Sequence, residues 1–181
     1  DLPFSMSFFR DNECTASFSD LKLKNDNIIT AMHRTFAVIE AKSPKYSLLG
    51  SLVDRSNFDQ PHHKTCNVGE SYLVIDQKGN VAKCHMEIEK PVATVFAEDP
   101  LTSIQLDQKG IQNIDVDEKE GCRDCEWRYG CAGGCPALTY RATGRYDVKS
   151  PYCDVYKEIY PALLRSQGRI LLKLNDIAIN V

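Results

Sequence analysis

The sequence lacks the long apolar run that a membrane span requires, and it has no excess of positive charge. No stretch of about 18 residues is apolar throughout, and the net charge is −3, with 22 basic against 25 acidic residues. No basic stripe is present, which argues against a nucleic acid or an anionic membrane as a partner. Residues 1–10 also lack the basic start and apolar core of a signal peptide. These absences predict a cytoplasmic protein.

A starting methionine is missing as well, since the chain begins Asp1-Leu2-Pro3-Phe4. This apolar opening is typical of the interior of a protein, and we therefore expect the chain to be a piece of a longer one. Apolar residues make up 43% of the 181 residues. That content is enough for the core of one medium domain, or of a small domain with an attached piece.

Cysteine, in contrast, is abundant, and four of the eight cysteines lie between Cys122 and Cys135. A packed core does not need sulfurs so close together. A metal ion or an iron–sulfur cluster does, because several thiolates must converge on one charged centre. Structural or disulfide-bonded cysteines are the alternative, although clustered cysteines in a reducing cytosol more often bind metal. Glycines between the last thiols let the backbone turn tightly and bring amide groups close to the sulfurs.

The N-terminal part predicts one strand and one helix. Residues 3–9 alternate loosely between apolar and polar, as strands do. Residues 25–39 carry an apolar stripe at helical spacing, with Asp26 or Asn27 as a plausible cap. A lone strand–helix pair cannot bury both of its faces. We therefore expect residues 1–60 to be the end of a larger α/β domain with its linker.

A β-hairpin is predicted over residues 71–86, with Gly79 in its turn. Glycine there can adopt the positive φ that such a turn needs. If the chain before the hairpin were straight, the thiols of Cys66 and Cys84 would lie about 20 Å apart. We therefore expect residues 66–70 to curl back over the hairpin and bring the two thiols together.

Two helices are predicted after residues 122–135, which we call the four-thiol stretch. Residues 136–146 favour a short helix that Gly144 ends. Ser150 is a good cap for the final helix, and Cys153 then falls in its first turn, where the positive helix end favours a thiolate. Gly168 is expected to end this helix.

Several other side chains allow simple predictions. The charged run 115–120 favours a solvated loop. Tyr72 and Tyr140 are expected in the core. Trp127 and Tyr129 lie between the clustered thiols, where they either shield a bound centre from water or pack in the core.

Taken together, the cysteines form a pattern with several independent spacings. It reads Cys66-x12-Gly79-x4-Cys84, Cys122-x2-Cys125-x5-Cys131-x3-Cys135 and Cys153. This pattern resembles the SPASM domain, the C-terminal extension of many radical SAM enzymes. The resemblance implies an α+β fold in two parts. Residues 61–181 would form a small β-hairpin, cysteine-rich loops and a C-terminal helix, and residues 1–60 the terminal β-α unit of a partial TIM-like barrel.

The resemblance also implies two auxiliary 4Fe–4S clusters with interleaved ligands. The ligands of the first cluster would be Cys66, Cys84 and Cys135. Those of the second would be Cys122, Cys125, Cys131 and Cys153. Because the first set has three thiolates, its fourth iron is either open or filled by another group. Cys14 and a nearby histidine such as His63 are the candidates for that position.

The function that the resemblance implies is the modification of a peptide or protein. Family members abstract hydrogen with a radical derived from S-adenosyl-L-methionine (SAM), while the auxiliary clusters accept an electron or bind substrate. The implied partners are that substrate, the missing N-terminal radical SAM barrel and an external electron donor. Sulfatase-maturing members carry an aspartate directly after the hairpin cysteine. This sequence has His85 there, which favours another peptide substrate.

The Cys-x3-Cys-x2-Cys motif of the SAM-cleaving cluster is absent from the chain. We therefore expect this segment alone to be inactive, with SAM and its cluster present only in the full-length enzyme. Two alternatives remain open. A non-catalytic interaction module could hold zinc at its thiolates, and zinc can also replace clusters in a fragment handled in air. A free-standing ferredoxin-like electron carrier is the other, although the x5 spacing does not fit ferredoxins.

Overall fold

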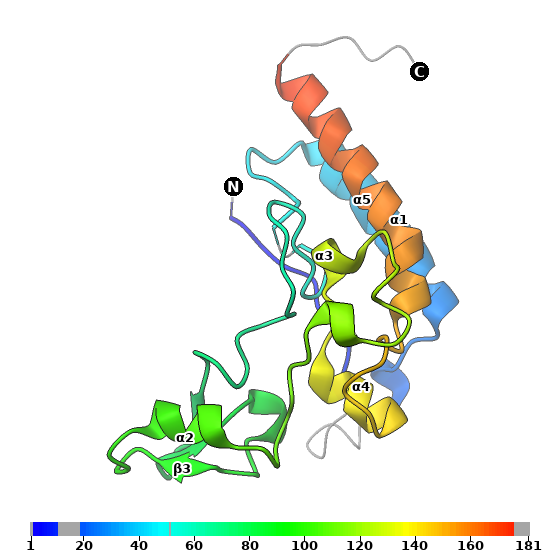
Figure 1. The fold of residues 1–181 in the computed structure, drawn as a ribbon. Helices are drawn as coiled ribbons and strands as arrows, with labels where there is room; N and C mark the ends of the chain where they lie inside the picture. Colours follow the sequence, from blue (N-terminus) through cyan, green and yellow to red (C-terminus); the bar gives the residue numbers. More distant parts are fainter. Residues whose placement is uncertain (1, 11–18, 51, 176–181) are drawn as a thin grey trace.

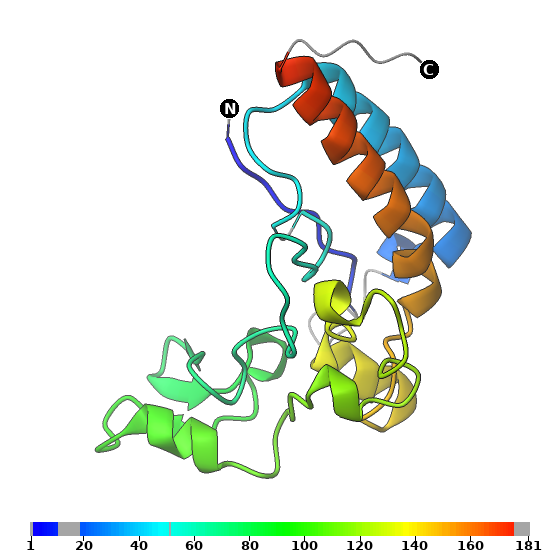
Figure 2. The same cartoon turned by 45° about the horizontal axis from the view of Figure 1, so that its top comes forward.

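The structure is a computed structural model that describes residues 2–10, 19–50 and 52–175. Two long helices, α1 (Asn25–Lys42) and α5 (Cys153–Leu174), lie side by side, as both views show (Figures 1 and 2). The short elements lie toward the other end of the molecule. They are the strands β1 (Val74–Ile75), β2 (Asn80–Ala82) and β3 (Ala93–Thr94), the helices α2 (Pro100–Leu106), α3 (Arg128–Cys131) and α4 (Pro136–Thr143), and the 3-10 turns η2 (Ser19–Leu21), η3 (His85–Glu87) and η4 (Val116–Glu118).

Helix α1 confirms the predicted helix and extends it by three residues to Lys42. The buried side chains of its apolar stripe are Ile28, Met32, Phe36 and Ile39. The predicted cap is wrong, because Lys24 occupies the cap position and no side chain bonds the free amides. The stripe therefore specifies this helix through its packing, without help from a capping residue.

The main core lies between α1 and α5. Helix α5 contributes a buried face, and the segment after α1 adds Leu48, Leu52 and Val53 to the same cluster. The backbone N–H of Leu48 donates to Oε1 of buried Gln167 at 2.7 Å, which ties that segment to α5. This core thus contains residues from both predicted parts, 1–60 and 61–181.

The predicted strand over residues 3–9 is wrong in its extent. Met6 forms a single parallel bridge with Val53, in which Met6 N–H donates to Leu52 O at 2.7 Å. A strand needs a partner along its length, and the described part of the chain supplies one at this position alone. The structure is α+β, and it contains no barrel strand among the described residues.

The hairpin is confirmed in place, although its strands are short. Val74 pairs with Ala82, Ile75 pairs with Val81, and Gly79 in the turn has a φ of +80°. A third antiparallel strand, β3, pairs with β2 and was not predicted, because residues 91–121 show no clear alternation.

The two C-terminal helices differ from the predictions at their ends. Gly144 ends α4 in the left-handed conformation as expected. The Oγ of Ser150 accepts from Tyr152 N–H at 3.2 Å, so Ser150 closes a turn before α5, and the helix begins at Cys153 itself. The predicted stop at Gly168 is wrong, because α5 continues to Leu174 with Ile170 buried. None of the described helices combines the length and apolarity of a membrane span.

Candidate functional site

Four cysteines line one pocket beside the first turn of α5, which we call the four-thiol pocket. Its thiols are those of Cys122, Cys125, Cys131 and Cys153. Trp127, Tyr156 and Tyr160 form its aromatic wall. The rings of Tyr156 and Tyr160 are stacked at 5.5 Å, and Trp127 lies 5.8 Å from Tyr160. Trp127 therefore both packs against the core and faces the pocket, so the two roles considered for it are compatible.

Consecutive backbone turns bring three of these thiols to one side. Cys125 N–H donates to Cys122 O at 2.8 Å, and Cys131 N–H donates to Trp127 O at 2.9 Å at the end of α3. The next three residues, Ala132, Gly133 and Gly134, all have positive φ values of 49°, 76° and 74°. Such a run reverses the chain, and the glycines make it sterically possible.

The reversal directs Cys135 away from the four-thiol pocket to a second pocket, the three-thiol pocket. Its cysteines are Cys66, Cys84 and Cys135. The predicted curl of residues 66–70 is confirmed, since the amides of residues 70–72 all donate to Asn67 O and Gly69 has a φ of +80°. Cys84 reaches the pocket from the end of β2, where the chain turns into η3.

All seven cysteines that the structure describes are free thiols. Cys14 lies outside the described residues. Burial raises the pKa of Cys122 to about 11, and the neighbouring thiols of Cys131, Cys153 and Cys125 add to the shift. Burial likewise raises the pKa of Cys66 and Cys84, with Cys135 contributing to both. The thiols within each pocket thus raise one another's pKa, and binding of a cation to them would release their protons.

Cationic side chains surround both pockets. Arg10 and Arg55 line the three-thiol pocket, while Lys149 and Lys157 line the four-thiol pocket. Buried Lys119 interacts electrostatically with thiols of both sets. Sequence reasoning missed all five, because they belong to segments far from the cysteines or show no local pattern.

The charged run 115–120 is only partly the solvated loop that was predicted. Val116 is fully buried and Lys119 is 1% exposed, because η4 packs against the four-thiol stretch. The prediction of core positions for Tyr72 and Tyr140 is wrong. Tyr72 is 37% exposed and Tyr140 is 43% exposed, with Tyr140 stacked on Tyr146 at the surface.

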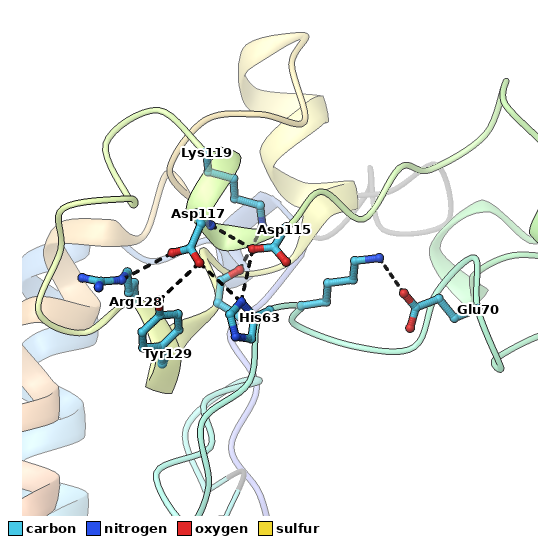
Figure 3. A network of polar contacts seen from close by, with 9 residues as sticks. His63, Glu70, Asp115, Asp117, Lys119, Arg128 and Tyr129 are labelled. Carbon is cyan, nitrogen blue, oxygen red and sulfur yellow. Dashed lines mark hydrogen bonds and ion pairs between the residues drawn. The ribbon is translucent and has the colours of Figure 1, made fainter.

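The structure places His63 among carboxylates and outside the lining of the three-thiol pocket (Figure 3). Its Nδ1 lies 3.4 Å from Asp115 Oδ1 and 3.4 Å from Asp117 Oδ2. Asp117 also accepts from the Tyr129 hydroxyl at 3.2 Å and pairs with Arg128 Nε at 3.4 Å. Among the histidines, cysteines and carboxylates of the described residues, His63, Asp115 and Asp117 are the one group whose ligand atoms all lie within 4.8 Å of one another. The network fixes η4 against α3.

The chain matches no protein-family model, and no solved structure gives a significant match. A protein from Archaeoglobus fulgidus, described as uncharacterized, is 29% identical over 133 residues. The match covers 70% of this chain and 32% of the archaeal protein, so the chain spans about a third of that relative's length.

Proposed function

We propose that the chain is the auxiliary-cluster region of a radical SAM enzyme that modifies a peptide or protein, and that it holds two 4Fe–4S clusters. The observation that carries the proposal is the division of the thiols between two pockets. One pocket takes Cys66, Cys84 and Cys135, and the other takes the remaining four described cysteines. The resemblance to SPASM domains implies the same division. Its interleaved order, with Cys135 crossing to the earlier pair, links the two pockets through one stretch of the chain.

The spacing of the sulfurs is wider than a single zinc ion requires. Among the described residues, the His63, Asp115 and Asp117 group is the one whose three ligand atoms lie within 4.8 Å of one another, so no three thiol sulfurs are that close. Four sulfurs at 2.3 Å from one zinc ion would lie about 3.8 Å apart.

The two pockets suit different roles. The four-thiol pocket has a full set of cysteine ligands and an aromatic wall that excludes water. When bound, a cluster supplies a one-electron centre whose potential depends on charge, hydrogen bonds to sulfur and solvent access. We assign the transfer of electrons to this pocket.

The three-thiol pocket adjoins a cleft of ≈ 410 Å³ that shares Arg55, Cys66 and Cys84 with it. Among the described residues, no acidic one lines either the pocket or the cleft. With one ligand fewer and an open approach, this side is the one a peptide substrate would reach. The missing radical SAM barrel and an external electron donor complete the proposed enzyme.

Loading of the purified chain tests the proposal. The chain is prepared without oxygen, reconstituted with iron and sulfide, and assayed for iron, acid-labile sulfide and zinc. Two 4Fe–4S clusters require about eight irons and about eight sulfides per chain, with broad visible absorption. A colourless chain with stoichiometric zinc and no sulfide would show instead a zinc-binding interaction module.

A second assay separates the proposed enzyme region from a free-standing carrier. The loaded chain alone should form no 5′-deoxyadenosine from SAM, because it lacks the cysteine triplet of the SAM-cleaving cluster. The same chain within its full-length protein should form it. Failure of the full-length protein to cleave SAM would favour an electron carrier.

A further inference from the structure

Lys119 is a buried lysine without an ion-pair partner among the carboxylates of the described residues. Its side chain is 1% exposed, and its Nζ donates to Ala132 O at 2.9 Å. Lys83 offers a direct comparison. It is 4% exposed, but its Nζ lies 3.1 Å from Asp107 Oδ2. A buried ammonium group costs several kcal/mol unless an opposite charge compensates it. Burial lowers the pKa of Lys119, while Cys122, Cys131, Cys66 and Asp115 favour its charged form, in that order.

Thiols of both pockets are among the groups that interact with Lys119, and as thiolate ligands they would carry the opposite charge. Electrostatic interactions of Lys119 connect it to Cys122 and Cys131 of the four-thiol pocket and to Cys66 of the three-thiol pocket. The charge of Lys119 in turn lowers the pKa of Cys122 and Cys66 against the effect of their burial. One amine thus faces both ligand sets.

Lys119 also holds the backbone that separates the two pockets. Ala132 O accepts from Lys119 Nζ at 2.9 Å. The one hydroxyl hydrogen of Thr65 is shared between Ala132 O, which lies 2.9 Å from Thr65 Oγ1, and Gly134 O, which lies 2.7 Å from it. A Cβ added at Gly133 would lie 2.9 Å from Lys119 Nζ. Thr65 lines the three-thiol pocket and Gly133 lines the four-thiol pocket. The amine of Lys119 is therefore fixed at residues 132–134, where the chain crosses from the four-thiol pocket to the three-thiol pocket and forms a wall that both pockets share.

We propose that Lys119 is a positioning residue that sets the reduction potential of both clusters by placing one positive charge between them. This inference rests on the proposed function. A cluster bound by thiolates becomes more negative when it accepts an electron, and a nearby cation in a buried site stabilises that reduced state. The charge of Lys119 acts on both centres at once, because it lies at the wall they share.

Anaerobic redox titration of the loaded chain tests the inference, with dithionite as the reductant and the paramagnetic resonance of each cluster as the signal. In Lys119→Met, both potentials should shift to more negative values. A tenfold fall in the ratio of reduced to oxidised cluster at a fixed potential corresponds to a shift of about 59 mV for one electron, and we expect at least this shift. Lys119→Arg, which keeps the charge, should retain potentials close to those of the wild type.

Lys83→Met is the control, because it also removes a buried lysine, but one that contacts the wall of the three-thiol pocket, where its Nζ donates to Ile111 O at 3.1 Å. It should lower stability and leave the potential of the cluster in the four-thiol pocket unchanged. If Lys119→Met binds both clusters at wild-type potentials, or if Lys83→Met shifts them equally, the inference is overturned while the proposed function stands. If the wild-type chain binds no iron and sulfide, the proposed function fails and the inference fails with it.

Loss of folding in Lys119→Met does not block the test. If that variant binds no clusters but Lys119→Arg binds both at wild-type potentials, the positive charge is the required property, which supports the inference. If neither variant binds clusters, the role of Lys119 is to hold the Ala132 crossover, and tuning of the potentials is rejected.

Discussion

The hydroxyl of Tyr156 donates a hydrogen bond of 2.5 Å to Asp54 Oδ2, although the two residues are 102 positions apart in the chain. The other carboxylate oxygen of Asp54 pairs with Arg10. Tyr156 lines the four-thiol pocket and Arg10 lines the three-thiol pocket. Asp54 is 5% exposed, so one buried carboxylate joins side chains from the walls of both pockets.

Replacing this carboxylate should destabilise the chain strongly. Asp54→Asn removes the negative charge that pairs with the largely buried Arg10 guanidinium, and we expect a loss of about 3–5 kcal/mol in the free energy of unfolding. Tyr156→Phe removes one hydrogen bond and should cost about 1–3 kcal/mol. Denaturant unfolding of the two variants, measured without oxygen, gives both values. A larger loss for Tyr156→Phe than for Asp54→Asn would contradict this account of the pair.

Gly130 is required by its contact with Phe58. Gly130 lies inside the four-thiol stretch, and a Cβ at this position would clash with the Phe58 ring. Gly130→Ala should therefore cost about 1–3 kcal/mol and reduce the iron bound per chain by displacing Cys131. Gly168→Ala is the control, because it lies in α5 with open space around it and should stabilise the helix by about 0.5–1 kcal/mol. Equal iron content and stability in Gly130→Ala and the wild type would refute the packing argument.

The proposed interleaved ligand sets predict different losses for two cysteines that are four positions apart. Cys131→Ser should remove the cluster of the four-thiol pocket, and Cys135→Ser the cluster of the three-thiol pocket. Each variant should retain about half of the iron and one of the two paramagnetic signals. Loss of the same signal in both variants would show that Cys131 and Cys135 bind one centre.

Stability should fall at acid pH through Asp107. Burial opposes ionisation of this carboxyl, but hydrogen bonds from Gly110 N–H and Lys83 outweigh it and hold the pKa of Asp107 below its usual value of 3.8. The carboxylate therefore contributes stability above that value, and the contribution is lost as the pH falls through the lower folded-state pKa. In Asp107→Asn, the melting temperature should be lower at pH 7 and should fall less between pH 5 and pH 2. An acid dependence equal to that of the wild type would rule out Asp107 as its source.

Local pattern was enough to predict the elements whose signal lies within one continuous segment. Helix α1 follows from its apolar stripe, and the hairpin follows from Gly79 and the two segments that flank the turn. Strand β3 has two residues and exists because β2 offers it an edge, so no alternation could reveal it. The start of α5 was misplaced because the side chain of Ser150 caps a single turn before the helix.

The candidate site shows the same limit. The resemblance implied which cysteines share a pocket, and the curl before the hairpin followed from the need to bring Cys66 to Cys84. Lys119 was assigned to a solvated loop because its neighbours in the sequence are acidic. Its burial depends on Ala132, which belongs to the four-thiol stretch, and on Thr65, which is distant in the sequence. Contacts of this kind become visible only when the chain is folded.

Cys153 is the first residue of a helix that is 22 residues long. At 1.5 Å per residue, α5 extends about 33 Å from the four-thiol pocket along α1. A tilt of about 5° at its first turn moves the opposite end by about 3 Å, since the displacement grows with the length of the lever. In a straight α5, a displacement of the sulfur at its base would therefore be amplified at its tip, and Pro161 inside the helix is the place where that transmission could be interrupted.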